Sequence, residues 1–421
     1  MLPLTGVTLP FVSYGGSSLL ISVLSLLLLF LINNSQATQP AVRPNPGPLL
    51  QLGTLLLAGL FCTALVSVWW AVVRGPDLLT RTDNPRRAIS DRTVRRGAIL
   101  DRNDQPINLS EGEPGQYTRV ARYTALGPVA GYTDPIYGQA GMEASLDEIL
   151  RGVQGNPLPL IWWNQLVYGQ PPPGIDVRTS LDLNLQASAD QLMQGNKGAL
   201  VLLNARNGEI LVMASHPTFN ANRIQELGES LLKNPDSPLL NRTAQGLYPA
   251  GPVLEPLLLA EQTQPANLNP DQWVALLSKY GLYTSPPLSL PAASSAAPSG
   301  QTASTARTDL QASPLQIALA VASLSNNGVR PAPNLVTAIR ERERGWVFRP
   351  TLGSSQRVSE EAQANAAASK LAVPGELFWQ SLAVASLGDK VVTWWLGGTL
   401  PEWNGAPLTL VVLLEENNPA L

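Results

Sequence analysis

Two apolar runs without a charged residue stand near the N-terminus, at residues 17–32 and 49–73. A helix needs about 20 apolar residues to cross the hydrocarbon core of a bilayer. The second run therefore predicts a transmembrane helix, and the first does so if residues before Ser17 extend it. The link between them contains four prolines, which stop a helix. We expect a helical hairpin with both ends on one side of the membrane, with Trp69 and Trp70 in the interfacial region.

Beyond these runs the pattern changes to short elements of mixed type. Residues 181–193 repeat their apolar positions at helical spacing and predict an amphipathic helix with Ser180 as its N-cap. Asp182 in its first turn suits the helix dipole. The expected buried face carries Leu185, Ala189 and Leu192.

A β-hairpin is expected directly after this helix. Residues 199–203 and 209–214 read as two strands joined through Asn207-Gly208, a dipeptide that favours hairpin turns because both residues tolerate positive φ. Two stretches rich in Ala and Ser, residues 287–306 and 354–374, lack a sustained apolar pattern and predict loops.

Composition narrows the classes of function. Charged residues make up 14% of the 421 residues and the net charge is -3, so no nucleic-acid partner is predicted. The single cysteine, Cys62, excludes an intramolecular disulfide and argues against a cysteine zinc site. The single histidine, His216, would have to serve any Ser-His-Asp triad, and we interpret it instead as a loop residue after a strand. No cofactor and no metal are predicted.

The first apolar run carries a family resemblance. Residues 3–19, PLTGVTLPFVSYGGSSL, resemble the signature before the last transmembrane helix of the SEDS family, the membrane glycosyltransferases of cell elongation and division. In that family the segment enters from outside and ends inside, which implies a cytoplasmic link and a large extracytoplasmic domain. The positive-inside rule indicates the reverse, because Arg43 is the only arginine of the link and four arginines follow the second run. We follow the resemblance, under which Met1 is either internal to a longer SEDS-transpeptidase fusion or the start of a gene remnant.

Residues 84–107, and downstream Gly131-Tyr132 and residues 137–152, resemble the pedestal of class B penicillin-binding proteins. The family segment RGxIxDRxG is matched by Arg96, Gly97, Ile99, Asp101 and Arg102, with Asp104 where the family has glycine. A later stretch, GxxGxE...L.G, is matched by Gly138, Gly141, Glu143 and Gly152. We interpret these residues as structural, holding the pedestal together.

The resemblance to class B penicillin-binding proteins runs on to the C-terminus and implies the fold. That fold is α+β and membrane-anchored: a penicillin-binding transpeptidase (beta-lactamase-like) domain with a small pedestal domain after two transmembrane helices. The implied division is residues 1–33 (SEDS-like segment), 34–48 (linker), 49–74 (transmembrane helix), 75–175 (pedestal) and 176–421 (transpeptidase-like domain). A helix in residues 313–333 and strands at residues 381–385, 390–398 and 408–416 complete it.

The nucleophile motif of that family is altered. Where the family reads YxPGSTFKP, this chain reads YPAGPVLEP, residues 248–256. Gly251 matches the glycine, but Pro252 stands in the nucleophile slot and Glu255 in the lysine slot. Proline offers no nucleophile, and glutamate reverses the charge that would organise the site. Both residues still suit a helix start.

The other two motifs, SxN and KTG, are also not found. We interpret the stretch that should carry SxN as deleted before residues 273–291, and Ser325-Asn326-Asn327 as a coincidental match. Where KTGTA is expected, residues 381–385 read SLAVA, with Ser381 and Ala383 in the lysine and glycine slots. Lys390 is a candidate substitute, although Val391-Val392 follow it instead of Thr-Gly.

Three functions remain open. The first is a non-catalytic, membrane-anchored homologue that acts in peptidoglycan synthesis as partner or regulator of a SEDS polymerase. The second is an active D,D-transpeptidase or penicillin-binding enzyme with unusual residues, and the third is a non-functional remnant of a SEDS-transpeptidase fusion. Loss of the motifs argues against the second, and intact apolar strands argue against the third. We expect the first, with the bilayer and a cell-wall synthesis complex as partners.

Overall fold

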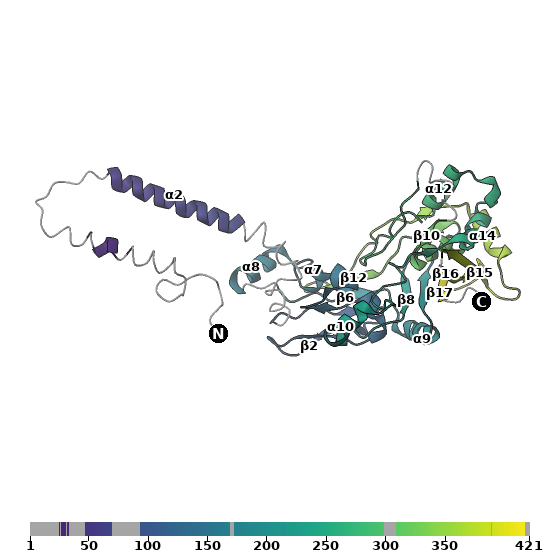
Figure 1. Cartoon of the computed structure of the whole chain (residues 1–421), viewed down its shortest axis with the longest axis horizontal. Coiled ribbons are helices and arrows are strands. Elements are labelled where there is room, and N and C mark those ends of the chain that lie inside the picture. The colour runs from purple at the N-terminus through teal and green to yellow at the C-terminus, as the bar shows by residue number, and fades with distance from the viewer. Residues whose placement is uncertain are drawn as a thin grey trace, which may run out of the picture. The chain divides into compact units, whose positions relative to one another are not determined.

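The computed structural model describes residues 25, 27–30, 32, 47–69, 93–168, 172–298, 309–388 and 390–416 of the chain. It divides into two units, Met1–Asp77 and Leu78–Leu421. In the first unit, helix α2 (Gly47–Trp69) contains the segment Leu50–Trp69, which is apolar and long enough to cross a membrane (Figure 1). It is the only such helix among the described residues; the first predicted span and Trp70 lie largely or wholly outside them.

The large unit, Leu78–Leu421, contains two main sheets. The six-stranded sheet has the order β13 (Gly345–Phe348), β12 (Val336–Glu341), β6 (Val177–Thr179), β1 (Ile99–Leu100), β2 (Pro106–Glu111), β3 (Thr118–Ala121). Strands β1 and β6 run parallel and the other pairs are antiparallel. This sheet joins strands from both sides of position 175, where the resemblance places a boundary.

The five-stranded sheet is antiparallel throughout. Its order is β15 (Phe378–Leu387), β16 (Lys390–Thr399), β17 (Leu408–Glu416), β7 (Gly198–Asn204), β8 (Ile210–His216). The predicted hairpin is therefore confirmed as β7 and β8, although only Gly208 of its turn has positive φ, at 72°. The three later strands are confirmed as β15, β16 and β17.

Helices cover both faces of the five-stranded sheet, at the right-hand end of the unit in Figure 1. On one face, Ala189 and Met193 of α9 (Leu183–Met193) pack against Leu200 and Leu211. On the other face, α13 (Pro314–Val321) packs against β7 and β17. Because both faces are covered, the central strands can be apolar at nearly every position.

The remaining elements of the described residues are short. Three two-stranded ladders are β4 (Thr133–Asp134) with β5 (Gly138–Gln139), β9 (Tyr248–Pro249) with β10 (Gln311–Ala312), and β11 (Val329–Arg330) with β14 (Gln356–Arg357). The other helices are α5 (Gly127–Ala130), α6 (Gly141–Ser145), α7 (Asp147–Leu150), α8 (Leu158–Tyr168), α10 (Ile224–Lys233), α11 (Glu255–Ala260), α12 (Pro270–Lys279) and α14 (Glu361–Lys370). Five 3-10 helices are η2 (Thr124–Leu126), η3 (Ala221–Arg223), η4 (Gly251–Leu254), η5 (Pro265–Asn267) and η7 (Ala322–Ser325).

Helix α9 differs from its prediction in cap and in face. Asp182 is the N-cap, and its carboxylate accepts hydrogen bonds from two backbone N–H groups of the first turn at 3.0 and 3.3 Å. The Ser180 hydroxyl instead donates to the backbone carbonyl oxygens of Ile210 and Asn334. Leu192 is 74% exposed, whereas Gln186 is buried and bonds the backbone N–H and carbonyl of Met213. A buried polar side chain with a full set of partners has replaced the apolar contact that periodicity predicted.

The prediction of a loop at residues 354–374 is also wrong. It contains β14 and helix α14, whose small face of Ala364, Ala367 and Ala368 is buried and packs near α11. Alanine has the highest helix propensity, so the same composition that breaks an apolar pattern favours a helix once a neighbouring helix covers it. In the first predicted loop, residues 287–298 hold no helix or strand, and residues 299–306 lie outside the described part.

Candidate functional site

The segment with the altered nucleophile motif begins at a well-anchored turn. Tyr248 packs edge-on against Trp394 of β16, with ring centroids 6.4 Å apart, and the Trp394 indole N–H donates to the carbonyl of Pro249 at 2.9 Å. The Tyr248 hydroxyl donates to Oε1 of Glu415 at 2.7 Å. The backbone leading into η4 is therefore held by two strands of the five-stranded sheet.

Pro252 and Glu255 lie side by side on the start of the η4–α11 helical segment. Both are exposed, whereas Val253 and Leu254 between them are buried. This spacing matches the SxxK slots read from the sequence. A proline ring and a carboxylate there provide neither an attacking hydroxyl nor a cationic amine.

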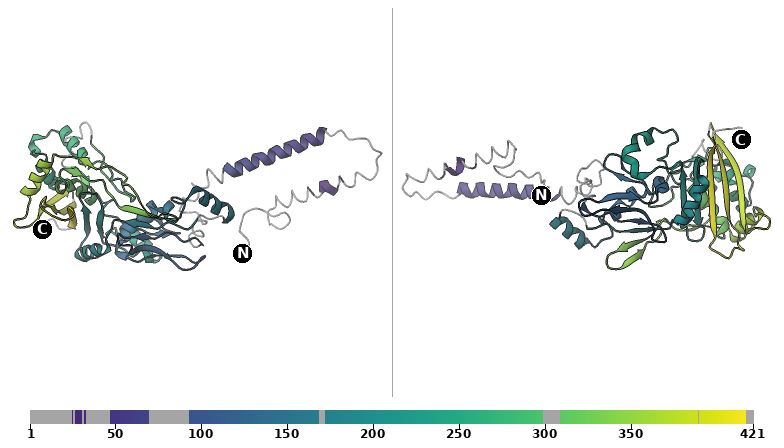
Figure 2. Two further views of the ribbon diagram at one scale, coloured as in Figure 1. Left: turned by 180° about the vertical axis from the view of Figure 1, so that it is seen from behind. Right: turned by 90° about the horizontal axis from the view of Figure 1, so that it is seen from below.

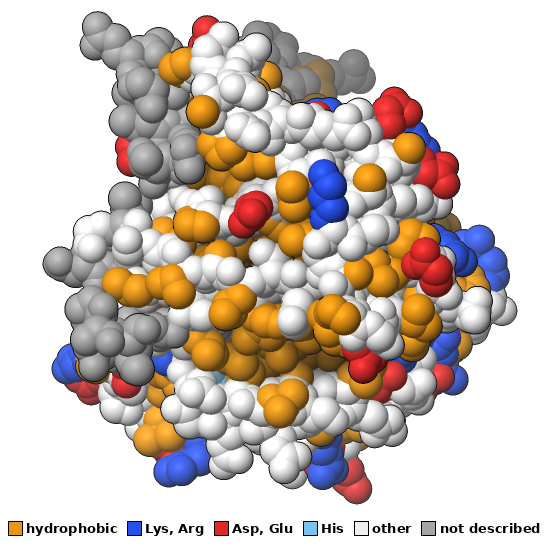
Figure 3. All heavy atoms as spheres, turned by 90° about the vertical axis from the view of Figure 1, so that its right-hand side faces the viewer, with side chains coloured by type: hydrophobic (Ala, Val, Ile, Leu, Met, Phe, Trp, Pro, Cys, Tyr) orange, Lys and Arg blue, Asp and Glu red, His pale blue; other side chains and the backbone are white. Residues whose placement is uncertain are grey.

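The edge strand β15 packs against η4. A Cβ atom built on Gly251, whose φ is 28°, lies 3.6 Å from the Cβ of Ala385. Ala383 and Ala385 are buried on the inner face of β15, and Ser381 on that face is half-buried. On the outer face Leu382 and Val384 are 70% and 55% exposed. Figure 3 shows apolar side chains gathered at this end of the molecule.

The structure brings together the regions that correspond to the first and third motifs, but not Ser325-Asn326-Asn327. The Ser325 hydroxyl accepts a hydrogen bond from the Trp379 indole N–H at 2.9 Å, near the opposite end of β15 from Ala385. Trp379 and Ala385 are six positions apart along the strand, which corresponds to roughly 20 Å. Asn326 donates to the carbonyl of Val329 within its own turn. The side chain of Lys390 lies outside the described residues.

His216 belongs to a different part of the unit, and it is not a loop residue as predicted. It is the last residue of β8, is 9% exposed, and its Nε2 lies 3.0 Å from Oδ1 of Asp190. The Tyr123 hydroxyl donates to the other oxygen of Asp190 at 2.8 Å, and burial followed by this carboxylate raises the pKa of Tyr123. These contacts tie β8 and α9 to the segment after β3.

A second polar cluster fastens the last strand. Arg242 is 1% exposed, and its Nε donates to Oε1 of Glu415 at 2.8 Å while its other nitrogens donate to backbone carbonyls of the Asp236–Ser237 turn. Burial would raise the pKa of Glu415, but the hydrogen bond from Tyr248 and the charge of Arg242 outweigh it, and the pKa is lowered. Sequence reasoning missed this cluster because its members are far apart in the chain and form no local pattern.

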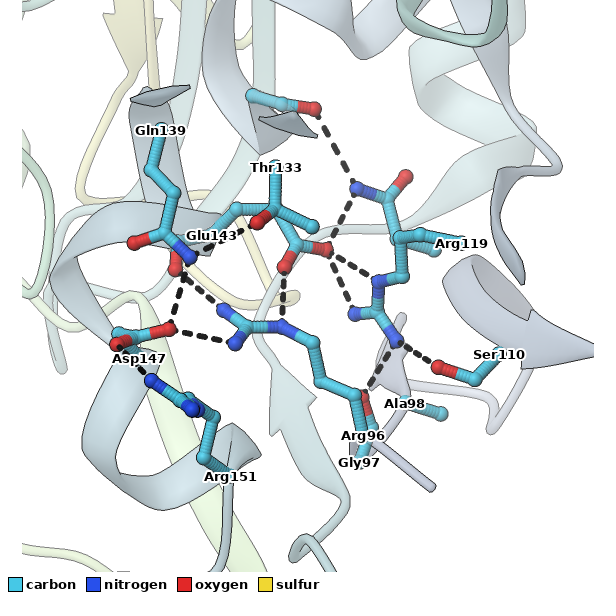
Figure 4. Close-up of polar contacts among 12 residues, drawn as sticks. Arg96, Gly97, Ala98, Ser110, Arg119, Thr133, Gln139, Glu143, Asp147 and Arg151 are labelled. Carbon is cyan, nitrogen blue, oxygen red and sulfur yellow. Dashed lines mark hydrogen bonds and ion pairs between the residues drawn. The ribbon is translucent and has the colours of Figure 1, made fainter. Parts of the chain in front are cut away.

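Two residues of the pedestal motifs, Arg96 and Glu143, meet in one buried cluster, which Arg119, Asn108 and Asp147 complete (Figure 4). Arg96 Nε donates to Oε2 of Glu143 at 2.8 Å, and Arg119 Nε donates to Oε1 at 2.7 Å. Asn108 adds a third hydrogen bond at 3.0 Å, and Arg96 also contacts Asp147 at 2.5 Å. Burial would raise the pKa of Glu143, but attraction to Arg119 and Arg96 outweighs it and lowers the pKa. These charged side chains pair with one another inside the fold, which fits the structural role predicted for Arg96 and Glu143.

No group of three or more His, Cys, Asp or Glu side chains within the described ranges is arranged to hold a metal ion. The polar clusters are internally paired, and the best chemical candidate therefore remains the junction of η4 and β15.

Family models and curated proteins match parts of this chain. Residues 198–260 and 257–370 match the model of the penicillin binding protein transpeptidase domain, and residues 1–38 match the model of a cell cycle protein family. Peptidoglycan D,D-transpeptidase MrdA of Acinetobacter baumannii is 35% identical over 137 residues, which are 29% of this chain and 20% of that protein. PbpA of Mycolicibacterium smegmatis is 26% identical over 198 residues, 42% of this chain and 40% of that protein. The chain thus matches less than half the length of these relatives.

Solved structures show the same fold. Penicillin-binding protein A from M. tuberculosis, as an imipenem acyl-enzyme complex, superposes with a TM-score of 0.65 at 20% identity over 78% of this chain and 96% of that chain. The D,D-transpeptidase domain of a peptidoglycan glycosyltransferase from Eggerthella lenta gives 0.64 over 77% and 94%. The large unit is a penicillin-binding transpeptidase fold. The predicted resemblance, class B penicillin-binding protein preceded by a SEDS-type cell cycle segment, is confirmed.

Proposed function

We propose that this chain is a membrane-anchored penicillin-binding protein homologue that does not acylate and that acts in peptidoglycan synthesis as a partner or regulator of a SEDS-family polymerase. The observation that carries the proposal is the exposed pair Pro252 and Glu255 at the start of η4–α11. Acyl transfer needs a nucleophile, a group that accepts its proton and donors for the developing oxyanion. In this chain a proline ring, that of Pro252, stands where the nucleophile is required.

Strand β15, which packs against η4, supports the same proposal. The inner face of β15 presents Ala383 and Ala385, which lack a polar side-chain atom, where a transpeptidase of this family would present its KTG motif. The surrounding scaffold is nevertheless well packed, with Trp379 and Trp394 fully buried. A maintained fold with an altered reaction site favours a binding or regulatory role.

The N-terminal unit supports the proposals of a membrane anchor and of a SEDS-family partner. Helix α2 provides one apolar span, and residues 1–38 match the cell cycle protein model. We propose that the large unit lies outside the cytoplasm, in reach of the cell wall and of a SEDS polymerase in the same bilayer.

An active D,D-transpeptidase is the second candidate, because the matched relatives MrdA and PbpA carry that name. The two candidates differ in one measurable property. Full-length chain purified in detergent and incubated with fluorescent penicillin should show no covalent label after denaturing electrophoresis, because no serine occupies the nucleophile slot. MrdA serves as the positive control and heat-denatured chain as the background. A stoichiometric label that survives denaturation would establish the enzyme and reject the non-catalytic proposal.

A further inference from the structure

Helix α8 presents an unusual surface. Its sequence, LPLIWWNQLVY, contains no charged residue. Among its described side chains Ile161 is buried, whereas Leu158, Trp162, Trp163 and Val167 are 74%, 67%, 61% and 49% exposed. Water in contact with this much apolar area is unfavourable, so the surface indicates a partner. None of the contacts that tie the pedestal residues together uses these four side chains.

Basic residues flank the apolar helix. The tip of the β12–β13 hairpin lies beside α8, where Arg342 and Glu343 share a shallow hollow with Leu160 and Trp163. The side chains of Arg340 and Arg344 in the same hairpin are 62% and 72% exposed, although Arg340 lies 3.8 Å from Asp176 and Arg344 pairs with Glu341. Next to them Phe348 of β13 is 79% exposed. The surface is therefore an apolar and aromatic ridge beside a hairpin tip in which Arg340, Arg342 and Arg344 alternate with Glu341 and Glu343.

We infer that α8 and the tip of the β12–β13 hairpin form a second membrane contact, in which Leu158, Trp162 and Trp163 enter the interfacial region of the bilayer and the hairpin arginines meet anionic headgroups. Tryptophan prefers this region, and apolar helices with neighbouring basic residues bind in the plane of anionic bilayers. Helix α8 has 11 residues, too few to cross the hydrocarbon core, so it lies along the surface.

The chain itself keeps the bilayer within reach of this helix. Residues 70–92 connect the candidate span of α2 to Thr93, and even fully extended they cover roughly 80 Å. A tethered surface is present at a high effective concentration, so a weak interfacial contact is enough to be occupied. Within the large unit, α8 lies at the end away from the five-stranded sheet (Figures 1 and 2), which would leave the η4–β15 junction free of the membrane.

The inference goes beyond the proposed function but rests on its membrane anchor, and the single cysteine makes it testable. In a Cys62→Ala background, Trp163→Cys is labelled with an environment-sensitive fluorophore. The full chain is then reconstituted into nanodiscs of phosphatidylglycerol and phosphatidylcholine in equal amounts. Leu192→Cys is the matched control, because Leu192 is 74% exposed on α9 near the opposite end of the unit.

We expect the probe at position 163 to shift its emission to the blue and to lose fluorescence to lipid spin labels near the headgroup more than to labels near the chain end. The probe at position 192 should do neither, and pure phosphatidylcholine should weaken the response at 163. Leu158→Cys repeats the test at a site where substitution removes little packing.

Equal behaviour of the probes at 163, 158 and 192 in a chain that co-elutes with the nanodisc would overturn the inference and leave the proposed function standing. Failure to co-elute would reject the membrane anchor as well. If α8 docks on a membrane protein instead, lipid labels leave the probe unchanged and adding a SEDS polymerase shields it from iodide; that result also overturns the lipid contact.

Discussion

At the scale of single residues, Glu143 is the buried carboxylate at the centre of the largest cluster of charged side chains described above. It is fully buried, and two arginines from segments before and after β1–β2 hold its two oxygens. A buried carboxylate is costly unless it is paired. Removing it would take the carboxylate partner from the buried Arg119 and would leave Arg96 with Asp147 alone. The cluster therefore joins β1, β3 and α6 through charge as well as through apolar packing.

Replacing Glu143 with Gln should lower the free energy of unfolding of the large unit by about 3–5 kcal/mol, because Arg119 loses its charge partner in a buried site and Arg96 keeps only Asp147. Glu229→Gln is the matched control, since Glu229 pairs with Lys233 at a position more than 70% exposed. It should change stability by less than about 1 kcal/mol. Denaturant titration of the full chain compares them, and equal midpoints would contradict the assigned role of Glu143.

The same carboxylate gives a pH dependence with a definite sign. Its pKa is lower in the folded chain than in the unfolded chain, so its stabilising contribution is complete above the unfolded pKa and is lost as the pH falls through the folded value. Acidification should therefore destabilise the wild type more than Glu143→Gln. Parallel stability curves for the two proteins would show that other groups control acid sensitivity.

At the scale of elements, the junction of η4–α11 with β15 decides whether chemistry can be restored. The backbone before η4 is fastened to Trp394 and Glu415, so the helix start is held in position regardless of the residue at 252. The groups missing for acyl transfer belong to two elements: the SxxK slots lie on η4–α11 and the KTG slots on β15. Residues that act as one catalytic unit contribute non-additively, so a single restored member returns little.

The variant Pro252→Ser with Glu255→Lys recreates SxxK at exposed positions of the helix start. We expect it to unfold at the same midpoint as the parent and to react with fluorescent penicillin no faster, because Ala383 and Ala385 on β15 supply no polar group to the reaction. The parent chain is the control for background labelling. Rapid acylation of the variant would show that only the nucleophile had been lost.

At the scale of the whole molecule, two signals disagree about sidedness. The SEDS-type segment at residues 1–38 implies a large extracytoplasmic unit, whereas the arginines that follow the second apolar run imply a cytoplasmic one. A membrane role for α8 is compatible with either side. The chemistry of peptidoglycan synthesis, in which the matched relatives take part by name, favours the outside.

A reporter that is active only outside the cytoplasm, fused after Leu421, should be active in cells, because we place the large unit on that side. A cytoplasmic reporter at the same position is the reciprocal control and should be silent. The opposite pattern would show that the arginine count determines the orientation.

Local signals in the sequence determined several elements by themselves. The uncharged run of α2 and the Asn-Gly turn between β7 and β8 were predicted because each depends on neighbouring residues alone. The fold class and strands β15 to β17 came from family resemblance. The substitutions Pro252 and Glu255 were equally visible, since a missing hydroxyl is a property of the residue.

Tertiary structure decided what depends on distant partners. Gln186 rather than Leu192 faces the core because its amide finds both backbone groups of Met213, and α14 forms from an Ala-rich segment because a neighbouring helix buries its small face. Ser325 becomes the acceptor for Trp379 only when η7 reaches β15. Likewise, only the fold sets Gly251 against Ala385, because the energies of burial and hydrogen bonding depend on which side chains meet and not on their order along the chain.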